Sequence, residues 1–337
     1  MSFSVGICGL PNVGKSTLFK ILTKREVKIS ERPFTTIEPN IGKVSVPDGR
    51  LKEIAKLIKP EKITYTQIEF VDIAGLIKGA HKGEGLGNQF LSEIRHCDAI
   101  VKVIRCFEDQ RVENILGEIN PQKEIEVLEI ELLMKDLETI ENSIKKLEKK
   151  DEKRRKLLEK IKDEVLKGKK IKEIGLTEEE KKLIRDYQFL TQKPVIYLLN
   201  INGKTKFEKP KVSFLEINLK EEEEMLELTD KEREELGLKS QIEKLIQECY
   251  KILDLISFFT IAKGKEAKAW TLKKGSKILE AALKIHSDFG KFVKAEVINW
   301  KKLIEAGGWQ KAKELGIIKI VGKNYIVEDG DVIEFKI

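Results

Sequence analysis

The chain has 337 residues, enough at roughly 100–200 residues per domain for two or three domains with a sizeable core, which excludes a short structureless peptide. Lys and Arg number 64 against 57 Asp and Glu, a formal net charge of +7. This charge favours a polyanionic partner such as RNA, although a solvated surface explains it equally well, and DNA is not expected.

Hydropathy and the spacing of the cysteines argue against a secreted, membrane-spanning, zinc-binding or disulfide-rich protein. The amino terminus lacks a basic region followed by a long apolar one, and no uninterrupted apolar run reaches the length needed to cross a bilayer. We therefore expect a cytoplasmic protein with no membrane partner. Four cysteines lie far apart, without the paired spacing of a zinc site or a disulfide framework, and are interpreted as reduced apolar residues. They are Cys8, Cys97, Cys106 and Cys249.

The first element is an apolar segment from Phe3 to Cys8 that turns through a glycine-rich loop into a helical pattern beginning at Lys15. Gly9 to Ser16 matches the P-loop pattern G-x-x-x-x-G-K-[ST] and has the strand, loop and helix context that the pattern requires. The sequence therefore predicts a site for Mg²⁺ with a nucleoside triphosphate. A chance glycine turn is the alternative.

Each part of this loop has a chemical role in binding a nucleotide. Inward-facing backbone N–H groups and the helix dipole bind phosphate oxygens, Lys15 neutralises the β and γ phosphates as a catalytic group, and the Ser16 hydroxyl ligates Mg²⁺. Asn12 is in addition a candidate ligand for a K⁺ ion that bridges the phosphates. The residues expected to contact the nucleotide are Asn12, Val13, Gly14, Lys15, Ser16 and Thr17.

Two later segments supply further groups that hydrolysis requires. Asp72-Ile73-Ala74-Gly75 ends an apolar strand, so we expect Asp72 to hold a water of Mg²⁺ and the Gly75 N–H to reach the γ-phosphate as a catalytic group. Thr36, between the P-loop and this strand, is expected to complete the metal shell when the triphosphate is bound. Each pattern is weak alone, but in this order they support each other.

The sequence leaves open which group activates water. Leu76 stands where Ras-like enzymes place the glutamine that orients the attacking water, and a leucine cannot do this. His81 is the nearby titratable candidate for catalysis. The alternative is that His81 is a solvated residue of the glycine-rich loop 79–87, and that another group, a partner or a bound cation assists.

The base-reading segment departs from the pattern of GTPases. The strand at 195–199 leads into Asn200-Ile201-Asn202-Gly203, so Gly203 occupies the position where Asn-Lys-x-Asp places its guanine-reading carboxylate. Asn200 and Ile201 are still expected to contact the purine. The expected wall of the base pocket is Ser213, Phe214 and Leu215.

Further β-rich runs predict a mainly parallel sheet with helices outside it, hence an α/β fold. The distance between these runs along the chain indicates an insertion. The runs lie at 41–46, 65–71, 99–105, 195–199 and 212–217.

Within the inserted segment 122–190, apolar residues recur at alternating spacings of four and three, as in the seam of a coiled coil. The pattern fails at 149–155 and then resumes, which predicts two antiparallel helices joined near Asp151, with one continuous helix as the alternative. The seam residues of the first helix are Leu133, Leu137, Ile140, Ile144 and Leu147.

From about Ser257 the pattern changes to short β-like runs around one helical segment at 276–285, which predicts a small α+β domain. The β-like runs lie at 268–272, 319–321, 325–327 and 332–337. The predicted domains are an NTPase domain at 1–121 and 191–256, a helical arm at 122–190 and a carboxy-terminal domain at 257–337.

Over essentially its whole length the chain resembles the Obg-like ATPase family of the YchF type. The agreement is far more specific than a P-loop match alone. It rests on GLPNVGKST at 9–17, TIEPN at 36–40, DIAGLIKGA at 72–80, GEGLGNQFL at 83–91, SFFT at 257–260, AWT at 269–271, KKG at 273–275 and VEDGDV at 327–332.

This resemblance implies a P-loop NTPase with an inserted antiparallel helical arm and a carboxy-terminal TGS domain of the β-grasp type. It also implies ATP hydrolysis in preference to GTP and association with the ribosome, through its large subunit or rRNA. The family has a hydrophobic residue at the position of Leu76 and a proposed catalytic histidine at that of His81. Members of the family usually have the motif Asn-x-x-Glu at this strand end, but Gly203 stands here in place of the glutamate. The residues of this chain therefore permit a preference for adenine without requiring it.

The leading hypothesis is an ATP-hydrolysing switch in which Mg²⁺ and the nucleotide order the segments 34–40 and 75–88 and thereby change affinity for a ribosomal partner. A GTPase of the same fold is the alternative within the enzyme class. An RNA- or ribosome-binding module with vestigial hydrolysis is the alternative from another class.

Overall fold

The computed structural model describes residues 3–24, 40–73, 93–148, 151–262, 265–286 and 294–336. Two compact units divide the chain. The first consists of Met1–Val44 and Glu69–Ile242, and the second of Ser45–Ile68 and Glu243–Ile337. The division into an NTPase domain, a helical arm and a carboxy-terminal domain stays a prediction.

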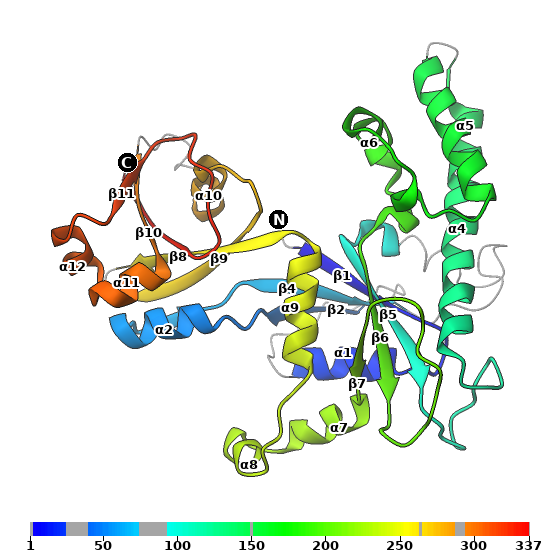
Figure 1. The fold of residues 1–337 in the computed structure, drawn as a ribbon, viewed down its shortest axis with the longest axis horizontal. Helices are drawn as coiled ribbons and strands as arrows, with labels where there is room; N and C mark the ends of the chain where they lie inside the picture. Colours follow the sequence, from blue (N-terminus) through cyan, green and yellow to red (C-terminus); the bar gives the residue numbers. More distant parts are fainter. Residues whose placement is uncertain are drawn as a thin grey trace, which may run out of the picture. The chain divides into compact units, whose positions relative to one another are not determined.

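A six-stranded sheet in the order β2-β4-β1-β5-β6-β7 forms the centre of the first unit (Figure 1). β1 pairs with β5, β5 with β6 and β6 with β7, all in parallel, which confirms the predicted α/β fold. Because these strands are parallel, their carboxyl ends meet at one edge of the sheet. The strands are β1 Phe3–Cys8, β2 Asn40–Ser45, β4 Gln67–Asp72, β5 Ala99–Cys106, β6 Val195–Ile201 and β7 Phe214–Ile217.

The central strand β5 is buried at every position, as expected for a parallel strand covered on both faces. Two of its residues, Lys102 and Arg105, are nevertheless charged and only 2% and 4% exposed. Both therefore need partners inside the protein. The helices of the first unit are α1 Lys15–Lys24, α4 Pro121–Lys146, α5 Glu152–Leu166, η3 Ile171–Glu173, α6 Glu178–Ile184, η4 Arg185–Tyr187, η5 Leu190–Gln192, α7 Leu219–Glu224, η6 Met225–Glu227 and α8 Asp230–Glu235.

The inserted segment forms the two helices that the coiled-coil pattern predicts. α4 ends at Lys146 and α5 begins at Glu152, which excludes one continuous helix. α4 begins beside the sheet and extends beyond it to the region where α5 packs against it (Figure 1). Ile140 of α4 and Leu158 and Ile161 of α5 are fully buried in their shared core.

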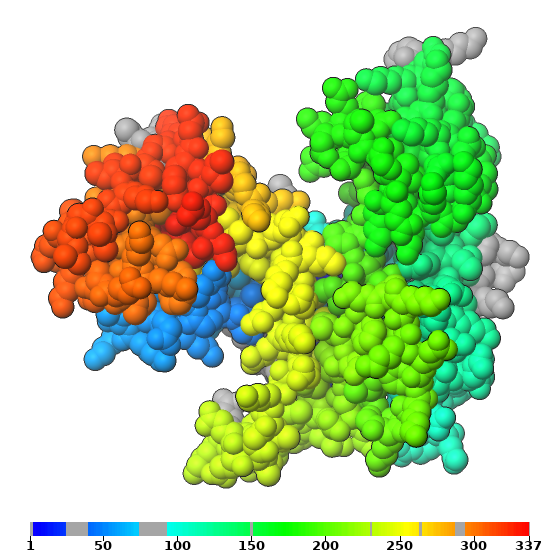
Figure 2. All heavy atoms as spheres, in the orientation of Figure 1, coloured from blue at the N-terminus to red at the C-terminus, as the bar shows by residue number. Residues whose placement is uncertain are grey.

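The structure adds a third layer to this hairpin that the heptad pattern did not indicate. Ile171, Ile184 and Phe189, from the chain that returns to the sheet, are buried in the same core. The atoms of the described parts of the insertion, teal to green, form one continuous body in Figure 2. The insertion is therefore a small globular structure as well as a coiled coil.

A buried carboxylate fixes the point where this returning chain reaches α4. Asp136, which is fully buried, accepts hydrogen bonds from the backbone N–H of Leu190 at 2.8 Å and of Thr191 at 2.8 Å. It also accepts one from the Thr191 hydroxyl at 2.7 Å. The chain leaves this clamp directly into β6, which carries residues of the candidate site.

We expect Asp136→Ala to lower the free energy of unfolding by roughly 2–4 kcal/mol, because two buried N–H groups and a hydroxyl lose their acceptor. Urea unfolding and the rate of tryptic cleavage within 167–193 would measure the effect. Asp151→Ala is the matched control, because the Asp151 side chain makes no capping hydrogen bond to α5. Equal stability of the two variants would contradict the conclusion that the Asp136 hydrogen bonds stabilise the protein.

The second unit contains a six-stranded sheet in the order β11-β10-β12-β8-β9-β3. Side chains alternate across it, so that Phe258 packs with α10 and Phe259 packs with α2 and α11 on the opposite face. The strands and helices are α2 Gly49–Ile58, β3 Lys62–Thr64, α9 Ile242–Ile252, β8 Leu255–Ala262, β9 Glu266–Lys273, α10 Ile278–Ile285, β10 Lys294–Asn299, α11 Trp300–Ala306, α12 Trp309–Glu314, β11 Lys319–Val321 and β12 Asp331–Lys336.

Two features of this unit differ from the sequence-based expectation. α2 and β3 come from the amino-terminal half of the chain, with Arg50 bonded to Asp329 at 2.7 Å and β3 parallel to β9. The run at 325–327 forms no strand, and Ile326 makes only an isolated bridge with Lys277. Across the described ranges, no helix combines the length and apolarity needed to cross a membrane.

Candidate nucleotide-binding site

The loop between β1 and α1 has a backbone that admits only glycine at two positions. A Cβ on Gly9 would meet the carbonyl oxygen of Val103 in β5. A Cβ on Gly14 would lie 2.5 Å from Asn200 Nδ2, and the Gly14 φ of +105° is itself unfavourable for other residues. The P-loop glycines are therefore required by close approach to neighbouring strands.

Lys15 lies within this loop rather than in solvent. It is 7% exposed, and its Nζ donates to the carbonyl oxygen of Leu10 at 2.8 Å. Burial lowers the pKa of Lys15, while the negative charge of Asp72 favours its protonated form. The ammonium group is thus held across the loop, where a phosphate group would meet it.

The two predicted metal-site residues that the structure describes, Ser16 and Asp72, lie together. Burial raises the pKa of Asp72, while the charge of Lys15 and a hydrogen bond from the Ser16 side chain lower it. A hydroxyl and a carboxylate in contact are oxygen ligands of the kind that Mg²⁺ takes. Four residues of the sequence-based site lie outside the described residues: Thr36, Gly75, Leu76 and His81.

Asn200 connects three elements beneath the loop. Its Nδ2 donates to the carbonyl oxygen of Val13 at 2.9 Å, and its Oδ1 accepts from the backbone N–H of Leu219 at 3.3 Å. The side chain is only 7% exposed. Asn200 therefore holds the end of β6, the P-loop and the start of α7 in one arrangement.

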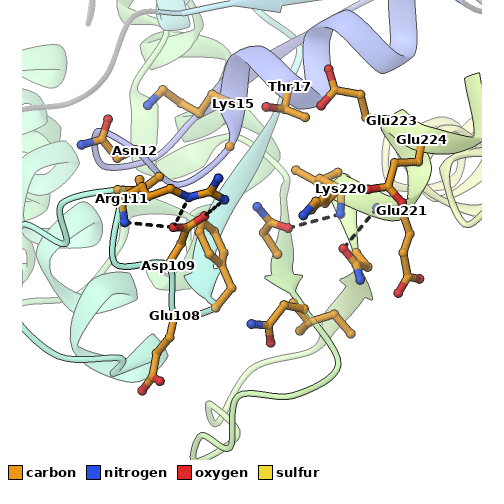
Figure 3. A pocket seen from close by; sticks show the side chains of 18 of the residues that line it. Asn12, Lys15, Thr17, Glu108, Asp109, Arg111, Lys220, Glu221, Glu223 and Glu224 are labelled. Atoms are coloured by element: carbon orange, nitrogen blue, oxygen red, sulfur yellow. Dashed lines mark hydrogen bonds and ion pairs between the residues drawn. The ribbon is translucent and has the colours of Figure 1, made fainter.

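A cavity of about 950 Å³ opens beside these residues. Figure 3 shows Asn12, Lys15 and Thr17 on one side of it, Glu108, Asp109 and Arg111 on a second, and Lys220, Glu221, Glu223 and Glu224 on a third. Its volume suits a nucleotide, since small-molecule sites commonly measure about 300–1,000 Å³. The predicted residues that line it are Asn12, Gly14, Lys15, Ser16, Thr17, Asn200 and Ile201.

Two family models match the chain. One, described as a 50S ribosome-binding GTPase, covers residues 4–164, and the other, a YchF-GTPase carboxy-terminal domain described as a protein of unknown function, covers residues 255–337. The ribosome-binding ATPase YchF of Buchnera aphidicola is 44% identical, with 99% of each chain covered. That of Escherichia coli O157:H7 is 43% identical, again with 99% of each covered.

A solved structure agrees over the same length. The YchF GTPase of Schizosaccharomyces pombe has a TM-score of 0.85 and 32% identity, with 99% of this chain and 98% of that one covered. The chain belongs to the YchF family. This confirms the resemblance found in the sequence, the fold class and the assignment to the P-loop nucleotide hydrolases.

The expected wall of the base pocket does not line the cavity. Ser213, Phe214 and Leu215 lie at the amino-terminal end of β7, whereas the cavity opens at the carboxyl ends of the parallel strands. The residues that follow β7 line it instead. They are Asn218, Leu219, Lys220 and Glu221.

A second part of the wall was not predicted from the sequence, namely the loop that follows β5. The buried guanidinium of Arg105 donates to four backbone carbonyls of this loop and so holds its shape. The acceptors are Phe107 at 3.1 Å, Asp109 at 3.5 Å, Val112 at 2.9 Å and Glu113 at 2.9 Å. The available signal was an arginine near the end of a strand that is apolar apart from Lys102.

Glu124, in the first turn of α4, is buried behind the same strand. Its Oε2 accepts from the Arg105 backbone N–H at 3.1 Å, while its buried Oε1 has no partner within the described ranges. Burial raises the pKa of Glu124 to about 8, although the Arg105 N–H and the charge of Lys15 oppose this. The carboxyl group is therefore largely protonated at neutral pH.

Gly14→Ala should abolish measurable nucleotide binding while the protein stays folded, because the new methyl group displaces Asn200 from the P-loop. Titration calorimetry with a non-hydrolysable ATP analogue would test this. Gly117→Ala is the matched control, since Gly117 also has a positive φ of +75° but has open space around its Cβ position. Retained binding by Gly14→Ala would contradict the requirement for glycine.

Glu124→Gln should flatten the pH dependence of stability between about pH 4.5 and 8. The folded-state pKa lies above the ordinary 4.5, so the folded protein binds more protons in this window and its stability falls as pH rises. The slope attributable to one carboxyl is at most about 1.4 kcal/mol per pH unit.

Urea unfolding at several pH values would show this slope as a difference between wild type and variant. Glu126→Gln, on the exposed side of the same helix, should leave the wild-type slope intact. An unchanged slope in Glu124→Gln would be evidence against the raised pKa.

Proposed function

We propose that the chain is a Mg²⁺-dependent P-loop ATPase whose nucleotide state controls its binding to the ribosome. The observation that carries this proposal is the contact of Asp72 with the Ser16 side chain, next to Lys15, where Lys15 and Ser16 both line the cavity. These groups suit a phosphate chain with its metal ion. Gly203, which lies between the cavity-lining residues Asn202 and Lys204, offers no side chain to select guanine.

The donor set fits magnesium bound together with a nucleotide. Ser16 and Asp72 supply oxygen ligands, and Thr36 is proposed as a third from outside the described residues. Among the described residues, no group of three or more His, Cys, Asp or Glu side chains forms a self-sufficient metal site. This agrees with an ion that shares its coordination shell with phosphates and water and that neutralises phosphate charge when bound.

Lys15 is proposed to act by exchanging partners. In the structure its Nζ donates to the Leu10 carbonyl, and a phosphate oxygen, being charged, is the stronger acceptor. Because the side chain is buried, its charge is screened less than that of a surface lysine and stabilises negative charge developing on the phosphates. Gly75 and His81 remain the proposed groups for sensing the γ-phosphate and for activating water.

The preference for ATP over GTP rests on missing hydrogen bonds. Guanine presents N–H groups at N1 and at the 2-amino position, and an acidic residue usually accepts from both. Gly203 cannot accept from them through a side chain. The relatives from Buchnera aphidicola and E. coli are named ATPases, which supports the same preference here.

Potassium is proposed as a second cation, held by Asn12. Its Nδ2 donates to the Glu113 carbonyl at 3.4 Å, which leaves the Oδ1 of this cavity-lining residue for a ligand. An exchange of K⁺ for Na⁺ that leaves turnover unchanged would refute this part of the proposal.

The ribosome is proposed as the partner because curated relatives are named ribosome-binding ATPases. The matching description of a 50S ribosome-binding GTPase favours the large subunit, through its proteins or its rRNA. The net charge of +7 is compatible with rRNA. A ribosomal partner in turn implies a cytoplasmic location.

Lys15→Met should reduce ATP turnover by at least about 100-fold, because the cation that meets the phosphates is removed. Phosphate release with ATP and GTP, each with Mg²⁺ and after chelation by EDTA, would measure activity and metal dependence. Lys24→Met is the matched control, since Lys24 is exposed in the last turn of the same helix. Cosedimentation with ribosomes would give the binding readout.

The outcomes separate the three hypotheses. Faster hydrolysis of ATP, with ribosome binding that changes with the nucleotide and is altered in Lys15→Met, supports the proposed switch. Equal or faster hydrolysis of GTP supports the GTPase alternative. Ribosome binding that ignores both the nucleotide and the Lys15 substitution supports a binding module with vestigial hydrolysis.

A further inference from the structure

The turn after β6 contains a side chain whose hydrogen-bonding direction is set by its own backbone. Asn202 Oδ1 accepts from the backbone N–H of Lys204 at 3.1 Å and of Thr205 at 2.9 Å. Since both partners are donors, the atom between them is the oxygen. The amide nitrogen is therefore on the other side, and within the described parts of the chain it donates to no protein group.

This turn is anchored on the far side as well. The Thr205 hydroxyl accepts from the backbone N–H of Glu108 at 3.1 Å, which joins the turn to the loop after β5. Asn202, Lys204 and Glu108 all line the cavity. The half-buried Asn202 amide is thus presented at the cavity wall in a fixed orientation.

Other amides and carboxylates of the cavity are less suited to read a base. Both amide atoms of Asn200 are used by Val13 and Leu219. The Asn218 Oδ1 accepts a single N–H, that of Glu221 at 3.3 Å, whereas the Asn202 Oδ1 accepts two at 3.1 and 2.9 Å, so the Asn202 amide is the more firmly oriented. Asp109 is bonded to Arg111, and Glu223 is paired with Lys20. Figure 3 shows the side chains of Glu108 and Glu221 extending away from Asn12 and Lys15.

We propose that Asn202 determines the base specificity of this site, its Nδ2 donating to N1 of adenine. Adenine N1 is an acceptor, whereas guanine N1 carries a hydrogen and would face another donor. The guanine N–H groups at N1 and at the 2-amino position would both lack an acceptor from Asn202. Unpaired polar groups of this kind reduce affinity by about 10- to 100-fold.

This inference rests on the proposed function and deepens it. It assigns recognition of the base to Asn202 in a chain that has Gly203 in place of the usual acidic residue. Gly203 has a φ of +71° and open space around its Cβ position, so it shapes the turn without contacting a ligand through a side chain. Its neighbour Asn202 then carries the selection.

Asn202→Asp tests this assignment with little change in shape. The carboxylate keeps one oxygen for the N–H groups of Lys204 and Thr205 and replaces the Nδ2 donor by an acceptor. We expect the ratio of affinities for non-hydrolysable ATP and GTP analogues, measured by titration calorimetry, to shift about 10- to 100-fold toward GTP. A triphosphate of 1-deazaadenosine, which lacks N1, should bind wild type about tenfold more weakly than the adenosine compound.

Asn218→Asp is the matched control, because it adds the same charge to the same cavity and also keeps its helix-capping oxygen. It should weaken both nucleotides equally and leave their ratio unchanged. An unchanged ratio in Asn202→Asp, or an equal shift in Asn218→Asp, would overturn the role of Asn202. Wild-type protein that binds neither analogue would instead overturn the proposed function, so the two failures are distinguishable.

Discussion

The nucleotide-binding site depends on the Asn200 side chain. This one amide bonds the Val13 carbonyl of the P-loop and the Leu219 N–H that begins α7, while its backbone belongs to β6. It lies 2.5 Å from where a Cβ on Gly14 would be, which ties the choice of glycine in the loop to the choice of asparagine on the strand. The shape of the loop is therefore set by the sheet and not by the loop sequence alone.

A second buried polar group organises the opposite wall in a similar way. Arg105 holds the loop after β5 through four carbonyls, and its own backbone N–H is bonded to Glu124. Lys102, also on β5, lies 3.9 Å from Glu129, which in turn accepts from Tyr197 and Lys170. Two charged residues in one buried strand thus connect the sheet to the cavity and to α4, because neither can stay buried without partners.

Structural features that depend on a short stretch of sequence could be predicted, whereas features that depend on contacts between distant residues could not. The P-loop, the paired helices of the insertion and the strand at β5 follow from short patterns of glycine and apolar residues. The expected base wall, Ser213 to Leu215, lies at the amino-terminal end of β7 and outside the cavity lining, so its role in binding the base stays a prediction. The loop held by Arg105 was missed, and so was the joining of α2 to the second unit through Arg50 and Asp329, because both depend on partners that no periodicity reveals.

The clamp at Asp136 has a consequence for how this architecture can vary. The inserted chain runs from Asp136 along α4, and it returns to Asp136 at Leu190 and Thr191. The hydrogen bonds of Asp136 therefore join the two ends of the segment that lies between these residues. Lengthening or shortening the hairpin tip changes the reach of the arm without shifting the register of β6 or moving Asn200. The distance over which the arm extends and the chemistry of the cavity are thereby free to evolve independently.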